Sequence, residues 1–259
     1  MIRLTYLLRR QPGMTREDFQ KYWREVHGPL VASFAVSLNI LRYVQVHTIL
    51  DESQNEQLPG RRGKMEKSYD GVEEIWWAER EEMVSGWKSS SGHRAWQAIL
   101  EDEKKFIDLA NSPLWFNYEY PQVNPCPENI VATEFSSLIK SYYALRHLPR
   151  FSLEQAQLYW RTSHGFLLRR IATVGHIKRY LQVHRYEDEM ELSMQKERGT
   201  LVEPYTGHAE LWFDRYAGND NAPEIVRGWE LAVEDENKFI DFTRSSMWYG
   251  KERVFVDYR

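Results

Sequence analysis

Arg42-Tyr43-Val44-Gln45-Val46-His47 recurs almost unchanged later in the chain as Arg179-Tyr180-Leu181-Gln182-Val183-His184. A second shared motif precedes each hexapeptide at the same spacing, Tyr22-Trp23-Arg24 with His27-Gly28 and Tyr159-Trp160-Arg161 with His164-Gly165. Self-similarity at a fixed spacing is the sign of a duplicated structural unit. With only two copies of this size, the sequence predicts duplicated domains and not a solenoid.

The matches continue downstream with small changes of spacing, as expected when loops vary in length and regular elements do not. Gly71, Glu74 and Trp76 correspond to Gly207, Glu210 and Trp212, and residues 101–108 correspond to residues 234–241. We therefore expect a first α+β domain at residues 1–120 (copy one), a linker at 121–135 and a second α+β domain at 136–259 (copy two).

The composition narrows the classes of function. Hydrophobic residues make up 42% of the 259 positions, which is enough for a sizeable core, and the net charge of −4 argues against nucleic acid as a partner. The single cysteine, Cys126, excludes an intrachain disulfide and reads as a bystander thiol in the linker, which fits a reduced, cytoplasmic location. No stretch approaches the roughly 20 apolar residues of a membrane span.

Each copy has the same predicted order of elements, βαββαβ. Thr15 and Ser152 are typical helix N-caps, each with Asp or Gln three residues later, and apolar residues at helical spacing follow them. The glycine after His27 or His164 is expected to end or bend this helix. The order is that of a ferredoxin-like unit, in which helices cover one face of the sheet. The other face then needs a partner, and the second copy of the sheet is the obvious one.

Alternation along the strands sorts the side chains into two sets. We expect Val44 and Val46 to lie under the helices, and Tyr43, Gln45 and His47 to face the space between the two sheets. Glu74 and Trp76 are expected on that same inner side. Each copy would then present aromatic and polar groups to one concavity, the usual composition of a small-molecule site.

A His beside a Glu in a partly dry pocket suits acid–base chemistry near neutral pH. The predicted proton-transfer residues are His27, His47, Glu74, His164, His184 and Glu210. The predicted substrate-binding residues are Tyr6, Trp23, Tyr43, Gln45, Trp76, Tyr143, Trp160, Tyr180, Gln182 and Trp212. Two alternatives stand beside this hypothesis: the polar groups satisfy one another inside a barrel, and His27 and His164 only stabilise a helix terminus. No metal is expected, because the sequence shows no ligand spacing around these histidines.

These motifs resemble the EthD-domain family, named for ethyl tert-butyl ether degradation, within the dimeric α+β barrel superfamily. The resemblance rests on Tyr22-Trp23 with His27-Gly28-Pro29, on residues 42–47, and on Tyr69-Asp70-Gly71 leading to Glu74 and Trp76. It implies two ferredoxin-like sheets packed into one barrel, here as an intramolecular pseudo-dimer. Copy two departs at Phe166 in place of Pro29 and at Thr206 in place of Asp70, so copy one is the favoured site.

The superfamily includes cofactor-free monooxygenases, polyketide cyclases, dehydratases, decarboxylases and haem enzymes. The resemblance therefore implies a cofactor-independent enzyme, an oxidoreductase or lyase, acting on a small aromatic or polyketide-like molecule. A non-catalytic accessory protein that binds a hydrophobic ligand is the alternative, and haem binding is a third. The expected partners are a small hydrophobic or aromatic molecule, with no nucleic acid and no membrane, in a monomeric pseudo-dimer or a homo-dimer.

Overall fold

Strands of the two copies pair with each other as well as within each copy. The computed structural model describes residues 1–215 and 221–259. Its strands are β1 (Ile2–Leu8), β2 (Arg42–Thr48), β3 (Gly71–Trp77), β4 (Leu114–Val123), β5 (Leu138–Leu145), β6 (Ile177–Tyr186), β7 (Gly207–Asp214) and β8 (Ser246–Asp257). The helices are α1 (Arg16–Tyr22), α2 (Gly28–Ser33), α3 (Glu52–Gln57), α4 (Arg80–Lys88), α5 (Ser90–Glu103), α6 (Leu153–Tyr159), α7 (Gly165–Ile171), α8 (Glu189–Arg198) and α9 (Pro223–Glu236).

The sheet is a closed barrel in the order β1-β3-β2-β8-β5-β7-β6-β4. Within it, β4-β1-β3-β2 and β8-β5-β7-β6 are the two antiparallel sheets of the copies, each with the ferredoxin-like order. Antiparallel pairing of β2 with β8 and of β4 with β6 joins the sheets along both edges. One chain thus supplies both halves of the barrel, and the predicted fold class, an intramolecular pseudo-dimer, is confirmed.

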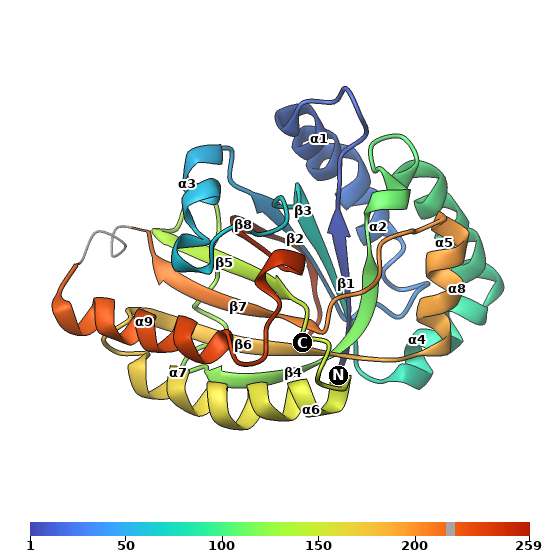
Figure 1. The fold of residues 1–259 in the computed structure, drawn as a ribbon. Coiled ribbons are helices and arrows are strands. Elements are labelled where there is room, and N and C mark those ends of the chain that lie inside the picture. The colour runs from blue at the N-terminus through green and yellow to red at the C-terminus, as the bar shows by residue number, and fades with distance from the viewer. Residues whose placement is uncertain (216–220) are drawn as a thin grey trace.

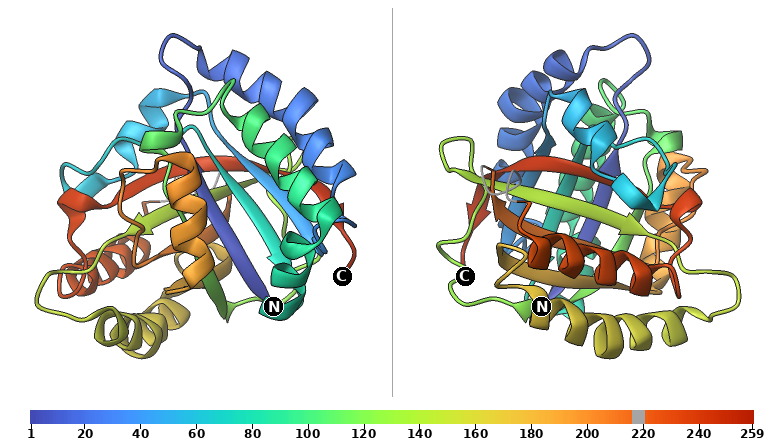
Figure 2. Two further views of the ribbon diagram at one scale, coloured as in Figure 1. Left: turned by 90° about the vertical axis from the view of Figure 1, so that its right-hand side faces the viewer. Right: turned by 60° about the vertical axis from the view of Figure 1, so that its left-hand side comes forward.

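The helices pack on the outside of the barrel in two groups (Figure 1). α1, α2, α4 and α5 cover the strands of copy one, and α6, α7 and α9 cover those of copy two. Figure 2 shows both groups from two further sides. α8 is an exception, because this helix of copy two lies beside α4 and α5 of copy one, where Met190 and Met194 join the core cluster of copy one. None of the helices in the described ranges combines the length and the apolar character that crossing a lipid bilayer requires.

The first helix of each copy begins where the sequence predicts. The Thr15 hydroxyl accepts a hydrogen bond from the Asp18 backbone N–H, and Ser152 forms a complete capping box with Gln155. The helix does not end at the histidine, however. A π-helical turn, Trp23–His27 in copy one and Trp160–His164 in copy two, leads directly into α2 or α7. Of the two predicted alternatives at the following glycine, a helix end or a bend, the helix end is therefore wrong.

That glycine serves close packing instead. A Cβ at Gly28 would lie 2.8 Å from the Gln45 Nε2 atom, and a Cβ at Gly165 would lie 3.0 Å from the Gln182 Nε2 atom. The glutamine side chains cross from the strands to the π-helical turns, where they donate to the carbonyl oxygens of Trp23 and Trp160, both at 2.9 Å. Because glycine has no side chain, the turn can approach the sheet closely at this position.

The predicted faces of the second strand are reversed. β2 pairs with β3 so that Val44 stands opposite Glu74 and Val46 opposite Val72, and directly paired residues share a face of the sheet. Val44 and Val46 therefore point into the barrel. The prediction that they lie under the helices is wrong. Both faces of β2 are buried, so the contrast between apolar and polar side chains does not distinguish inside from outside.

Candidate active site

The reversal separates the predicted site residues into two places. On the helix side of the sheet lie Tyr6, Tyr43, Gln45, His47, Tyr143, Tyr180, Gln182 and His184 of the strands, and Trp23, His27, Trp160 and His164 of the π-helical turns. Inside the barrel are Glu74, Trp76, Glu210 and Trp212. The predicted pairing of the histidines with Glu74 or Glu210 in one pocket is therefore wrong, because the sheet stands between them.

Glu74 and Glu210 belong to a buried ion network at the centre of the barrel. The Lys140 ammonium lies 3.0 Å from Glu74 and 3.1 Å from Glu210, and the Arg3 guanidinium contacts both carboxylates. His208 lies 3.0 Å from Glu210. The alternative that buried polar groups satisfy one another inside the barrel is confirmed for these two glutamates.

His47 and His184 support the tryptophans. His47 stacks on Trp23 and His184 stacks on Trp160, both with ring centroids 4.5 Å apart. Burial lowers the pKa of His47 well below its ordinary value, and burial together with Arg161 lowers the pKa of His184 to about 3. Both imidazoles are thus neutral at physiological pH and are not suited to carry protons.

In copy one, His27 lies between two carboxylates. Its Nδ1 atom is 2.8 Å from the Asp102 carboxylate of α5, and its Nε2 atom is 3.5 Å from Glu73 Oε2 of β3. Burial alone would lower the pKa of His27, but Asp102 and Glu73 outweigh burial and raise it to about 9. Trp23 Nε1 and the Tyr43 hydroxyl also donate to Glu73 Oε2, each at 3.2 Å. His27 is therefore an imidazolium that is hydrogen-bonded to Asp102 through Nδ1 and faces Glu73 at ion-pair distance through Nε2.

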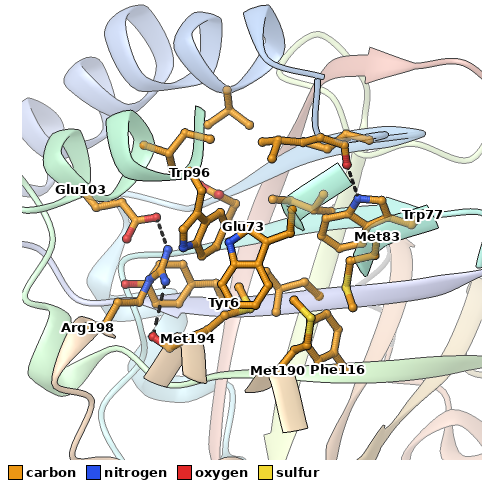
Figure 3. A pocket seen from close by; sticks show the side chains of 17 residues that line it. Tyr6, Glu73, Trp77, Met83, Trp96, Glu103, Phe116, Met190, Met194 and Arg198 are labelled. Carbon is orange, nitrogen blue, oxygen red and sulfur yellow. Dashed lines mark hydrogen bonds and ion pairs between the residues drawn. The ribbon is translucent and has the colours of Figure 1, made fainter. Parts of the chain in front are cut away.

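The space beside this cluster, cavity one, is almost filled. It measures about 30 Å³, room for about one water molecule. Met190, Met194 and Arg198 of α8 lie on one face of that helix and occupy the space (Figure 3). The Arg198 guanidinium reaches Glu103 at 2.7 Å and lies 4.5 Å from the ring centroid of Trp96. A helix from copy two thus fills the pocket of copy one.

Copy two has the same pairing of a histidine with an aspartate, but there it borders an open cavity. His164 Nδ1 lies 3.0 Å from the Asp235 carboxylate of α9, as His27 lies against Asp102. The position of Glu73 is taken by Ala209, since Tyr143 pairs with Ala209 as Tyr6 pairs with Glu73. His164 and Ala209 border a space of about 820 Å³, cavity two, within the usual range for small-molecule sites.

Copy one contributes a side chain to cavity two. Arg62 follows α3 and forms a two-pronged ion pair with Glu236 of α9, at 2.5 and 2.7 Å. Arg62 also lies 5.4 Å from the ring centroid of Tyr143, whose buried hydroxyl has no hydrogen-bond partner among the described residues. The segment that carries Arg62 does not fill cavity two as α8 fills cavity one, which accounts for the difference in volume.

The sequence differences that favoured copy one lie outside both cavities. Phe166 is a largely exposed side chain of α7. The Thr206 hydroxyl accepts a hydrogen bond from the His147 backbone N–H, whereas Asp70 in copy one binds Arg10 and Arg16. These differences concern loop contacts and do not distinguish the two cavities.

Sequence reasoning missed the acidic partners of the histidines. Asp102 and Asp235 stand in the repeated segments 101–108 and 234–241, so the repeat carried a signal, but nothing in their spacing links them to His27 or His164. Glu73 was overlooked because the adjacent Glu74 matches Glu210 in the repeat, whereas Glu73 has no glutamate at the matching position of copy two. Arg62 and Arg198 stand in polar loop and helix segments that showed no motif.

Comparison with known proteins agrees with this fold. The family model of the EthD domain matches residues 11–110 and 148–243. The chain belongs to the EthD-domain family. The EthD protein is similar in structure to an anthrone oxidase-like protein, with a TM-score of 0.59, 11% identity, and coverage of 100% of this chain and 94% of the other. A putative monooxygenase from Fusobacterium nucleatum subsp. nucleatum matches with a TM-score of 0.51 and 6% identity, over 98% and 93% of the chains. No curated protein sequence matches this EthD chain.

Proposed function

We propose that this EthD protein is an enzyme that oxidises a small aromatic molecule with dioxygen in cavity two, with His164 as the general base. The observation that carries the proposal is the position of His164. Its Nδ1 atom is held by Asp235 at 3.0 Å, and its ring borders a cavity of about 820 Å³. A base whose second nitrogen is fixed by a carboxylate has the orientation that proton transfer requires.

The comparison with copy one supports the choice of cavity. His27 has an equivalent aspartate, but Asp102 and Glu73 raise the pKa of His27 to about 9, so near pH 7 His27 already carries the proton that a base must accept. Cavity one, at about 30 Å³, has no room for an aromatic substrate. This proposal replaces the sequence-based preference for copy one.

Dioxygen is the only oxidant that the proposed reaction needs. His164 takes a proton from an activated C–H or O–H group, and the electron pair stays on the substrate as a delocalised anion. The anion reduces dioxygen and combines with it to form a peroxide anion, to which His164 returns the proton. Loss of water from this hydroperoxide converts a methylene carbon to a carbonyl. One methylene group and one dioxygen give one carbonyl and one water. The names of the two similar structures, an anthrone oxidase-like protein and a putative monooxygenase, favour oxidation over dehydration or decarboxylation.

Oxygen uptake with anthrone as the trial substrate tests the proposal. We expect uptake of one dioxygen per anthrone by the purified chain, and a loss of about 10²–10⁴-fold in the His164→Ala variant, the range for removal of a general base. The exposed His93 of α5 provides the control, because His93→Ala should keep full activity. Full activity of His164→Ala would remove His164 from the mechanism.

A hydrophobic-ligand-binding accessory protein is the second candidate, favoured by the size of cavity two. It predicts ligand binding without oxygen uptake. If haem bound here, His164 would be the residue to hold the iron, since a ligating histidine usually has its other nitrogen held by a carboxylate or carbonyl. The nitrogen that holds the iron cannot also act as the base. Titration with haemin decides whether His164 is a haem ligand or a general base. Our proposal expects no Soret shift that depends on His164.

A further inference from the structure

Copy one contains a built-in carboxylate ligand. Glu73 Oε2 lies 3.2 Å from Trp23 Nε1, 3.2 Å from the Tyr43 hydroxyl and 3.5 Å from His27 Nε2. These groups come from the π-helical turn and from β2. Trp23 and Tyr43 donate hydrogen bonds to this oxygen, and the His27 imidazolium faces it at ion-pair distance. The arrangement is a complete binding site for one anionic oxygen.

Copy two keeps every donor and lacks the carboxylate. Trp160, Tyr180 and His164 occupy the positions of Trp23, Tyr43 and His27, while Ala209 replaces Glu73. The three donors and Ala209 all border cavity two. The place of the Glu73 carboxylate is therefore part of the cavity in copy two.

The hydrogen bonds of Tyr180 leave its own proton available. Its hydroxyl oxygen accepts from Trp160 Nε1 at 3.3 Å and from Gln182 Nε2 at 2.9 Å. In copy one, the Tyr43 hydroxyl accepts from Gln45 at 2.8 Å and donates to Glu73. Burial raises the pKa of Tyr180 well above its ordinary value, so the hydroxyl remains a donor near neutral pH.

We infer that cavity two binds the anionic oxygen of an aromatic carboxylate or phenolate at the position that the Glu73 carboxylate occupies in copy one. Tyr180 and His164 are donors to this oxygen, and the Trp160 N–H turns to it from the long 3.3 Å hydrogen bond that it makes to the Tyr180 hydroxyl. The apolar walls around Leu211 and Trp229 hold the aromatic body. The inference rests on the proposed function for the identity of the pocket and extends it by naming the class of ligand.

For a phenol, binding includes one proton transfer. The ligand O–H bond breaks, the proton moves to His164 Nε2, and the electron pair stays on the ligand oxygen. Asp235 then stabilises the imidazolium, as Asp102 does beside His27. A carboxylate arrives already ionised and takes the same place, and the proton on His164 Nε2 then comes from solvent. Hydrogen bonds to ionised groups are about twice as strong as neutral ones, so the site should prefer anions.

Calorimetric titration of the full chain with naphthoate and with uncharged naphthylmethanol tests the inference. We expect one naphthoate per chain, bound about tenfold or more tightly than naphthylmethanol, as expected for a hydrogen bond to a charged group. Ala209→Glu places a carboxylate where copy one has it and should abolish naphthoate binding. Ala209→Gln, of similar size and uncharged, is the matched control and should weaken both probes alike.

Trp160→Phe provides a second variant if Ala209→Glu does not fold. It removes one donor and keeps an aromatic ring, so it should weaken naphthoate binding and leave naphthylmethanol binding unchanged. Equal affinities for the two probes, no binding of naphthoate, or full naphthoate binding by folded Ala209→Glu would overturn the inference. Anion-selective binding without oxygen uptake would instead support the inference and contradict the proposed oxidation.

Discussion

Replacing Glu73 with Gln tests the charge cluster that distinguishes the two copies. Glu73→Gln keeps the shape of the side chain and its bonds from Trp23 and Tyr43, but removes the negative charge 3.5 Å from His27 Nε2. Burial disfavours the imidazolium of His27, and Asp102 and Glu73 together overcome burial to give a pKa of about 9 in place of 6.5. Without Glu73, the pKa of His27 should fall back toward 6.5.

The sign and size of the effect follow from proton linkage. A histidine whose pKa is raised on folding stabilises the folded state fully below pH 6.5, and this stabilisation is lost as the pH rises through about 9. The interval corresponds to about 3 kcal/mol at 1.36 kcal/mol per pH unit. Glu73 supplies part of this stabilisation. The difference in unfolding free energy between wild type and Glu73→Gln should therefore be largest below pH 6.5 and smaller by about 1–2 kcal/mol above pH 9.

Urea unfolding at several pH values between 6 and 10 measures this difference. The exposed Glu17 of α1 provides a control, and Glu17→Gln should follow the wild-type curve at every pH. A stability difference between wild type and Glu73→Gln that stays constant from pH 6.5 to above 9 would refute the assignment of His27 as an imidazolium held by Glu73.

Two further predictions concern buried charge elsewhere. Arg198→Met should destabilise the protein by about 3–5 kcal/mol in chemical unfolding, because it leaves the buried Glu103 carboxylate unpaired. Adding Glu103→Gln to this variant should recover much of the lost stability. As a control, Arg61→Met at an exposed position should have little effect. Burial lowers the pKa of His184 and of His208 to about 3, so stability should fall as the pH decreases from 6.5 toward 3. Replacing His184 with Phe should reduce this loss of unfolding free energy at acidic pH, measured by urea unfolding. An unchanged loss would contradict the burial of a neutral imidazole at His184.

The fold was predictable because duplication is a long-range signal that a single sequence contains. Repeated motifs gave both units, and the βαββαβ order predicted the ferredoxin-like topology and its closure into a barrel. The inside of the barrel was not predictable in the same way. Val44 and His47 are both buried, so polarity does not reveal which face of β2 is interior; only the register with β3 decides it.

The site was predictable only in part. His164 was a candidate because it ends a repeated motif, but its partner Asp235 reaches it through the packing of α9 against the π-helical turn, which no local pattern encodes. The decisive difference, Glu73 against Ala209, was visible in the sequence and hidden by the adjacent match of Glu74 with Glu210. The filling of cavity one by α8 depends on where a helix of one copy packs on the other.

A crystal structure of the chain with naphthoate tests the central claim most directly. We predict naphthoate in cavity two, with a carboxylate oxygen within hydrogen-bonding distance of His164 Nε2, Trp160 Nε1 and the Tyr180 hydroxyl, and cavity one still filled by Met190 and Arg198. Naphthoate bound in cavity one or inside the barrel, or bound in cavity two with its carboxylate away from His164, would contradict the account.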